Sequence, residues 1–176
     1  LWRNLFGQAE RLRLDARVAS IAWPVNTAEF DYFLGGTFTK PGFLSPDTDL
    51  VAVVSAERTI HPNYTETSAA GRLGLTHFFS DELTFEGGAS FKRARFEDGF
   101  GTRDFSTVGV YAGATYDGRD STVDPTEGFY ASGMLEPFYD LRFGKAGARI
   151  TIEGRTYFGF SEDDAFILDR KSTRLN

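Results

Sequence analysis

Cysteine is absent from the sequence, which excludes a disulfide framework and a metal site built from thiolates. Proline is scarce, with six residues in a chain of 176, and the longest purely apolar run is residues 50–54. A helix that crosses a bilayer needs about 20 apolar residues, so the sequence predicts no transmembrane helix. The net charge is −6 and no basic cluster occurs, which argues against a nucleic-acid partner.

Patterns that carry catalysis are missing as well. The two histidines, His61 and His77, lie on different predicted elements and have no partner at a metal-ligand spacing. No Gly-x-Ser-x-Gly elbow, phosphate-binding loop or His-Glu-x-x-His motif occurs. We therefore expect a protein that is not an enzyme, has no catalytic or metal-binding residue and needs no cofactor.

Glycine and phenylalanine are abundant instead, at 19 and 18 residues. Apolar and polar side chains alternate along most of the chain, as in strands, whose side chains change face at every residue. Each alternating segment has about ten residues, the length of a tilted strand that crosses a bilayer. No segment keeps a helical period, so the predicted fold class is all-β and antiparallel. The eight predicted strands are residues 10–23, 31–39, 49–59, 67–79, 83–92, 107–116, 129–136 and 146–158, with a polar loop at 97–103.

Aromatic residues gather at one end of the predicted sheet, on its apolar face. The middle of that face holds Leu, Val, Ile, Ala and Gly, and the other face is expected to carry charged and hydroxyl side chains throughout. An aromatic girdle beside an aliphatic band is typical of a lipid-facing barrel wall around a wet lumen. A soluble β-sandwich is the alternative, because its strands also alternate. The predicted girdle consists of Phe38, Phe79, Phe85, Tyr116, Phe129 and Phe158.

The stretch between two of these strands, residues 116–128, predicts a structured turn. Its short carboxylates can accept hydrogen bonds from nearby backbone N–H groups, its proline fixes φ, and its last glycine is free of steric limits. A calcium site is the alternative, but the spacing of a calcium-binding loop is lacking, so we favour a turn that caps itself. The residues of this turn motif are Asp117, Arg119, Asp120, Asp124, Pro125, Thr126 and Gly128.

The same turn, Tyr-Asp-x-Arg-Asp…Asp-Pro-Thr-x-Gly, resembles one in the barrel domains of bacterial outer-membrane assembly factors, the BamA/TamA family. The TamA-like branch, which assembles autotransporters, is the more similar. Three other segments share the resemblance, which covers about residues 3–166: Asn4-Leu5-Phe6-Gly7, Phe38-Thr39-Lys40-Pro41-x-Phe43 with the following Asp49-Leu50, and Phe79-Ser80-Asp81.

This resemblance implies a protein of the bacterial outer membrane that inserts or translocates other proteins. It implies a barrel of sixteen strands behind periplasmic POTRA repeats, of which this chain would hold the N-terminal half as an open, curved sheet. The turn at residues 116–128 would then be periplasmic. The implied partners are outer-membrane lipid, unfolded outer-membrane client proteins, and a periplasmic or inner-membrane protein such as TamB.

In this family the seam between the first and last strands can open, and a strand edge can template an incoming strand. The first predicted strand would therefore be the seam strand, with Glu10, Leu12, Leu14, Ala16, Val18 and Ser20 as the pairing residues.

We expect three segments in the chain. Residues 1–9 would be a linker from a missing periplasmic domain, and residues 10–168 the partial barrel, including a ninth strand that begins at Ala165. Residues 169–176 would be a non-native tail, translated from a sequencing adapter, rather than an ordinary polar C-terminus. Other functions left open are a passive porin or small structural barrel, and an outer-membrane hydrolase for which no Ser–His pair can be placed.

Overall fold

The computed structural model describes residues 2–4, 7–20 and 30–158. Three expectations fall outside these residues: the end of the first predicted strand at 21–23, the ninth strand that begins at Ala165, and the tail at 169–176. Among the described residues no helix is long and apolar enough to span a bilayer.

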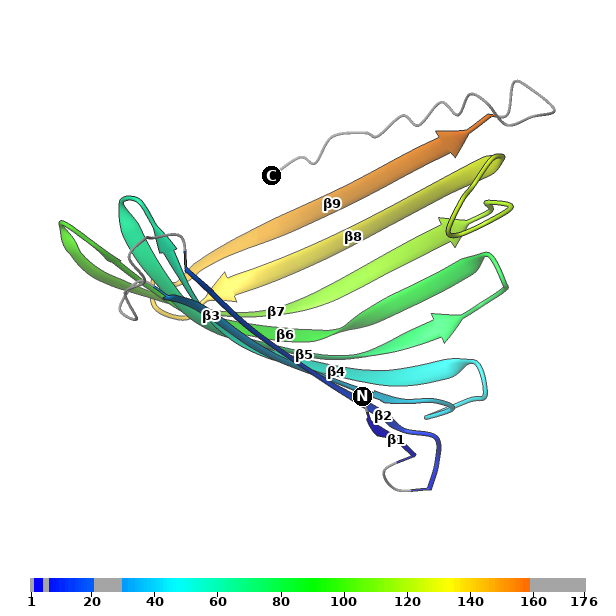
Figure 1. Ribbon diagram of the computed structural model, residues 1–176, viewed down its shortest axis with the longest axis horizontal. Helices are drawn as coiled ribbons and strands as arrows, with labels where there is room; N and C mark the ends of the chain where they lie inside the picture. The colour runs from blue at the N-terminus through cyan, green and yellow to red at the C-terminus, as the bar shows by residue number, and fades with distance from the viewer. Residues whose placement is uncertain (1, 5–6, 21–29, 159–176) are drawn as a thin grey trace.

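The described chain forms one antiparallel sheet of nine strands in sequence order (Figure 1). Every strand pairs with its neighbour in the sequence, as expected when hairpins follow one another. The strands are β1 Trp2–Arg3, β2 Arg11–Ser20, β3 Phe30–Lys40, β4 Thr48–His61, β5 Tyr64–Phe78, β6 Leu83–Asp98, β7 Gly101–Asp117, β8 Gly128–Asp140 and β9 Lys145–Tyr157.

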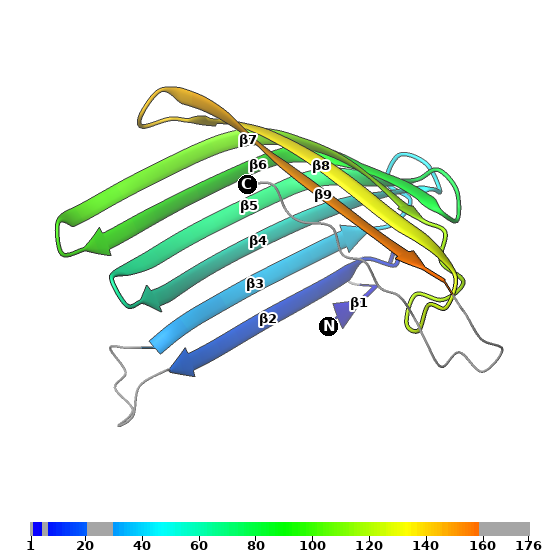
Figure 2. The ribbon, with the colours of Figure 1, turned by 90° about the horizontal axis from the view of Figure 1, so that it is seen from above.

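The sheet curls into an open trough and does not close on itself (Figures 1 and 2). Within the described residues β9 pairs only with β8, and no pairing joins β9 to β2. This confirms the predicted fold class, an all-β antiparallel open sheet.

Several strands are longer than the sequence predicts. The polar loop expected at residues 97–103 is wrong, because β6 continues to Asp98 and β7 begins at Gly101, which pair directly. Only Gly99 and Phe100 form the turn, and the Phe100 N–H donates to Asp98 Oδ1 at 2.8 Å. Backbone hydrogen bonds hold strands together whatever their side chains are. A strand end that is polar on both faces shows no alternation, and its sequence therefore looks like that of a loop.

A short strand precedes the first predicted one. Trp2 pairs with Leu12 and Arg3 with Arg11, so β2 has a neighbour on both sides at this end. The predicted seam strand is therefore not the first strand of the sheet, and its residues Arg11 and Leu12 are already paired with β1. Between β1 and β2, Asn4, Gly7 and Ala9 have positive φ, a backbone geometry that alternation does not reveal.

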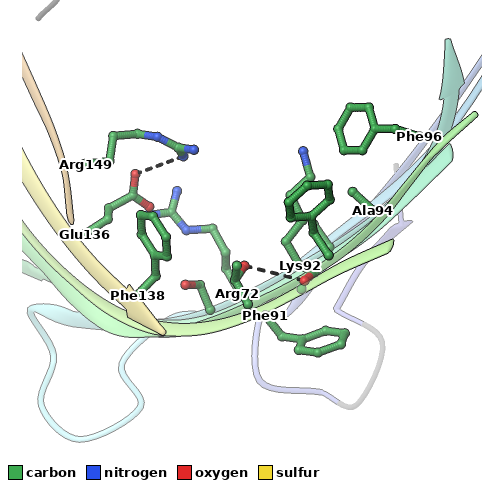
Figure 3. A pocket seen from close by; sticks show the side chains of 13 residues that line it. Arg72, Phe91, Lys92, Ala94, Phe96, Glu136, Phe138 and Arg149 are labelled. Carbon is green, nitrogen blue, oxygen red and sulfur yellow. Dashed lines mark hydrogen bonds and ion pairs between the residues drawn. The ribbon is translucent and has the colours of Figure 1, made fainter. Parts of the chain in front are cut away.

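One face of the sheet is apolar and uncovered. Across six strands, one row of paired residues runs Leu12, Phe38, Ala52, Leu73, Ala89, Val110. Figure 3 shows Phe91, which shares the parity of Ala89, on the outside of the curve, so we call this the convex face. Only three hydrophobic residues are buried in the described part of the chain, Ala94, Tyr111 and Tyr157. The sheet has no second layer there, and its large apolar side chains face outward.

The opposite, concave face is not polar throughout, contrary to the expectation. Lys92, Ala94 and Phe96 follow one another on it, and Phe138 faces them from β8 (Figure 3). The Phe105 ring lies 5.5 Å from the Phe96 ring, edge to face. Aromatic rings bury area against one another even beside water, so they can line a polar trough.

Candidate functional site

Four of the six predicted girdle residues lie in strands, on the convex face at one end of the sheet. The pairing register puts Phe38, Phe85, Tyr116 and Phe129 on the face of Leu73 and Val110. The Phe79 ring meets the Phe85 ring edge to face at 6.1 Å, and Tyr116 stacks on Phe129 at 4.8 Å. Phe158 directly follows β9 and is exposed. That these rings lie at a membrane interface stays a prediction.

Asp120 organises the turn between β7 and β8. Its carboxylate accepts the N–H groups of Ser121 at 2.9 Å, Thr126 at 3.0 Å and Glu127 at 3.2 Å, and the Thr126 hydroxyl at 2.6 Å. These bonds favour the charged form, so the Thr126 hydroxyl first, and then the backbone amides, lower the pKa of Asp120 to about 2. A single carboxylate thus ties both ends of the loop.

A second interaction fixes the base of the same turn. Arg119 donates to both carboxylate oxygens of Asp117, at 2.7 and 2.8 Å, and its guanidinium lies 5.2 Å from the centre of the Tyr130 ring. Gly128 has a φ of +102°, and a Cβ there would lie 2.2 Å from the Gly118 carbonyl oxygen. Only glycine fits this position without strain.

Asp124 differs from the other two aspartates. Its N–H donates to Ser121 Oγ at 3.2 Å, but its carboxylate has no hydrogen-bond partner in the described chain. No group of three or more His, Asp or Glu residues in that part of the chain could hold a metal ion. The hydrogen bonds that hold this turn therefore involve the carboxylates of Asp117 and Asp120, and not that of Asp124.

The two histidines do not share a site. His77 Nδ1 lies 2.9 Å from Thr48 Oγ1, and the His61 ring stacks on Tyr64 at 4.3 Å. These contacts are at opposite ends of β4, because Thr48 begins this strand and His61 ends it.

The outer edge of β2 is the candidate seam. β1 covers it at Arg11 and Leu12, and no described residue pairs with the outer edge from Arg13 onward, which includes Leu14, Ala16 and Val18. Glu10 is not an edge residue: it is 2% exposed, its carboxylate accepts the Gln8 N–H, and its carbonyl accepts the Asn4 N–H at 2.6 Å.

Sequence reasoning missed a cluster on the concave face (Figure 3). The Arg72 guanidinium lies 4.0 Å from the centre of the Tyr111 ring and donates to Glu136 Oε1 at 2.8 Å, and Arg149 reaches Glu136 at 3.6 Å. The cluster borders a groove of about 480 Å³ that Phe96, Phe105 and Phe138 also line.

A sequence signal for this cluster exists. Gly74 pairs with Gly88, and Gly88 pairs with Tyr111, so two glycines stand beside one tyrosine on three neighbouring strands. Glycine in a strand interior marks a close approach of other atoms. Here a Cβ on Gly74 would meet the Tyr111 hydroxyl, and a Cβ on Gly88 would meet the backbone of Leu73 and Gly74.

The family model of the Omp85 superfamily domain matches residues 4–176. No match to a curated protein was found for this chain. The family match spans nearly all of the open antiparallel sheet described above, together with the capped turn. The chain belongs to the Omp85 superfamily.

Proposed function

We propose that this chain is part of the wall of an outer-membrane β-barrel that assembles or translocates other outer-membrane proteins, and that client strands pair at the outer edge of β2. Membership of the Omp85 superfamily implies outer-membrane protein assembly or translocation in general, by assembly factors rather than enzymes. The observation that carries the membrane placement is the uncovered convex face.

This face exposes a continuous apolar surface. Val18 is 65% exposed, Leu34 60% and Val110 58%. A soluble monomer rarely leaves a surface of this size open to water, whereas a barrel wall needs one toward lipid. The other exposed members include Leu14, Val54, Leu73, Phe85, Phe91, Phe129, Leu135, Ile150 and Ile152.

The height of the apolar band fits a bilayer. On β6 the convex face is apolar from Leu83 to Phe91 and becomes charged at Arg93. The steps from Leu83 to Phe91, at about 3.4 Å each, span roughly 27 Å along the strand. A strand tilt of about 40° reduces this to roughly 20 Å, close to the apolar band of about 25 Å in outer-membrane barrels.

The edge of β2 supports strand exchange. An unpaired backbone edge costs several kcal/mol per polar group in hydrocarbon, so a partner strand is demanded there. A client strand can supply the missing hydrogen bonds by β-augmentation. Because β1 already covers Leu12, the pairing surface begins at Arg13 and includes Leu14, Ala16 and Val18.

We place the protein in the TamA-like branch, with autotransporter-type clients and TamB as a partner. The support is the turn at residues 116–128, where Asp117 and Asp120 make the ordered contacts described above. On this proposal the turn faces the periplasm.

Crosslinking in cells tests the seam. The full-length protein carries Leu14→Cys on β2, and a client carries a cysteine in its last strand. Val110→Cys is the matched control, because Val110 lies on the same face but on β7, which has a partner on both sides. We expect a disulfide to the client through Leu14 and none through Val110.

Equal crosslinking at both positions, or client assembly with no crosslink at Leu14, would contradict the seam. For a passive porin, deletion of the protein would lower solute permeability and leave the levels of other outer-membrane proteins unchanged.

A further inference from the structure

A second groove lies on the convex face, at its β2–β6 side, with a volume of about 680 Å³. One row of paired residues crosses it: Ala16, Leu34, Ala56, Ala69 and Arg93. Three of these strands contribute an alanine, and these small side chains leave a shallow trough. Other positions on this face carry larger side chains. The floor is therefore apolar on β2 to β5 and ends at a cation on β6.

Arginines form one end of the groove. Arg95 lies beside Arg93 on the same face, and Arg58 of β4 also lines the groove. The one acidic side chain at this end is Asp104, which binds Arg95 at 2.8 Å and Arg142 at 3.1 Å. Asp104 is thus already shared between two cations.

Arg93 has no ion-pair partner among the described residues, although it is exposed. The groove end consequently carries a surplus of positive charge where the apolar band stops. Glu57 and Arg17 border the groove by their backbone, since their side chains belong to the concave face: Glu57 accepts from Ser68 there, and Arg17 stacks on Phe33.

We propose that this groove binds a phosphate-bearing lipid, with an acyl chain along the alanine floor and the phosphate at Arg93 and Arg95. Guanidinium groups bind phosphate oxygens by charge-assisted hydrogen bonds, and alanine-lined troughs accept a flexible chain. This inference rests on the proposed placement of the convex face in lipid. The groove lies toward the end of the sheet opposite the 116–128 turn, so in the proposed orientation the lipid belongs to the outer leaflet.

The test measures binding of lipid A to the detergent-solubilised full-length protein by native mass spectrometry. A cation near a membrane surface contributes about fivefold to lipid affinity, so Arg93→Gln should weaken lipid A binding about fivefold and Arg93→Gln with Arg95→Gln further. Ala69→Phe fills the floor without a change of charge and should also weaken binding. Arg11→Gln is the control, because Arg11 is exposed and without an ion pair in the described chain but lies on the concave face.

Three results would overturn the lipid site. If Arg93→Gln binds lipid A as tightly as the wild type, Arg93 does not contact the phosphate. An equal loss in Arg11→Gln shows a general charge effect. Full lipid A binding by Ala69→Phe, with competition by inorganic phosphate, shows a phosphate site without an acyl groove. Circular dichroism confirms that each variant is folded. Crosslinking through Leu14 is scored separately in every variant, so failure of the seam is distinguished from failure of the lipid site.

Discussion

The Tyr111 ring lies so close to Gly74 that a Cβ on this glycine would sit 2.2 Å from the tyrosine oxygen. The same Cβ would sit 2.4 Å from the Gly87 carbonyl oxygen, which is backbone and cannot swing away. The Arg72 guanidinium lies over the same ring, 4.0 Å from its centre. The tyrosine thus joins three strands on the concave face, in a space that exists because Gly74 has no side chain.

Replacement of this glycine should destabilise the sheet. We expect Gly74→Val to lower the free energy of unfolding by about 1–3 kcal/mol, the usual cost of overpacking, with the strand backbone or the Tyr111 ring displaced. Urea unfolding of the detergent-folded protein measures the change. Gly154→Ala is the control, because no atom lies within 4 Å of its added Cβ and its φ is not positive. A loss in the control as large as in Gly74→Val would contradict the packing argument.

The two faces of β9 should respond differently to a charge. Ile152 lies on the convex face and Thr151 on the concave face. An arginine on the lipid side of a barrel costs about 2–4 kcal/mol near the middle of the bilayer, whereas a lumen position is nearly neutral. We expect Ile152→Arg to reduce the free energy of folding into vesicles by this amount. Thr151→Arg should change the same free energy by no more than about 0.5 kcal/mol. Equal effects of the two variants in a vesicle-folding titration would contradict the proposal that the convex face contacts lipid.

The stability of the capped turn should depend on pH through Asp120. Its pKa is lowered to about 2 in the folded chain, chiefly by the Thr126 hydroxyl, and an unfolded aspartate has a pKa of about 3.9. A lowered pKa gives stability that is present above about pH 4 and is lost as the pH falls toward 2.

Hydrogen exchange of the Thr126 and Glu127 amides across this range measures the effect, and Asp120→Asn should remove the pH dependence. Asp124→Asn should leave it intact, because the Asp124 carboxylate has no hydrogen-bond partner in the described residues. Identical exchange profiles for wild type and Asp120→Asn would show that this carboxylate does not cap the turn.

Alternation in the sequence determined the strands wherever one face is apolar and the other is not. Residues 107–116 and 129–136 show this pattern, and they lie in β7 and β8. The turn between them was also readable, because Asp120 and Gly128 act through local hydrogen bonds and local φ. These features depend on a few neighbouring residues, so a sequence alone can carry them.

Only the tertiary structure decided the rest. The pairing of Asp98 with Gly101 and of Trp2 with Leu12 depends on backbone hydrogen bonds, which leave no mark on side-chain alternation. Phe96 and Phe105 lie on the concave face, where their rings meet across neighbouring strands. This contact joins two strands and depends on their register. Alternation separates two faces but does not say which one is inside the curve, because curvature arises from the summed twist and register of all the strands.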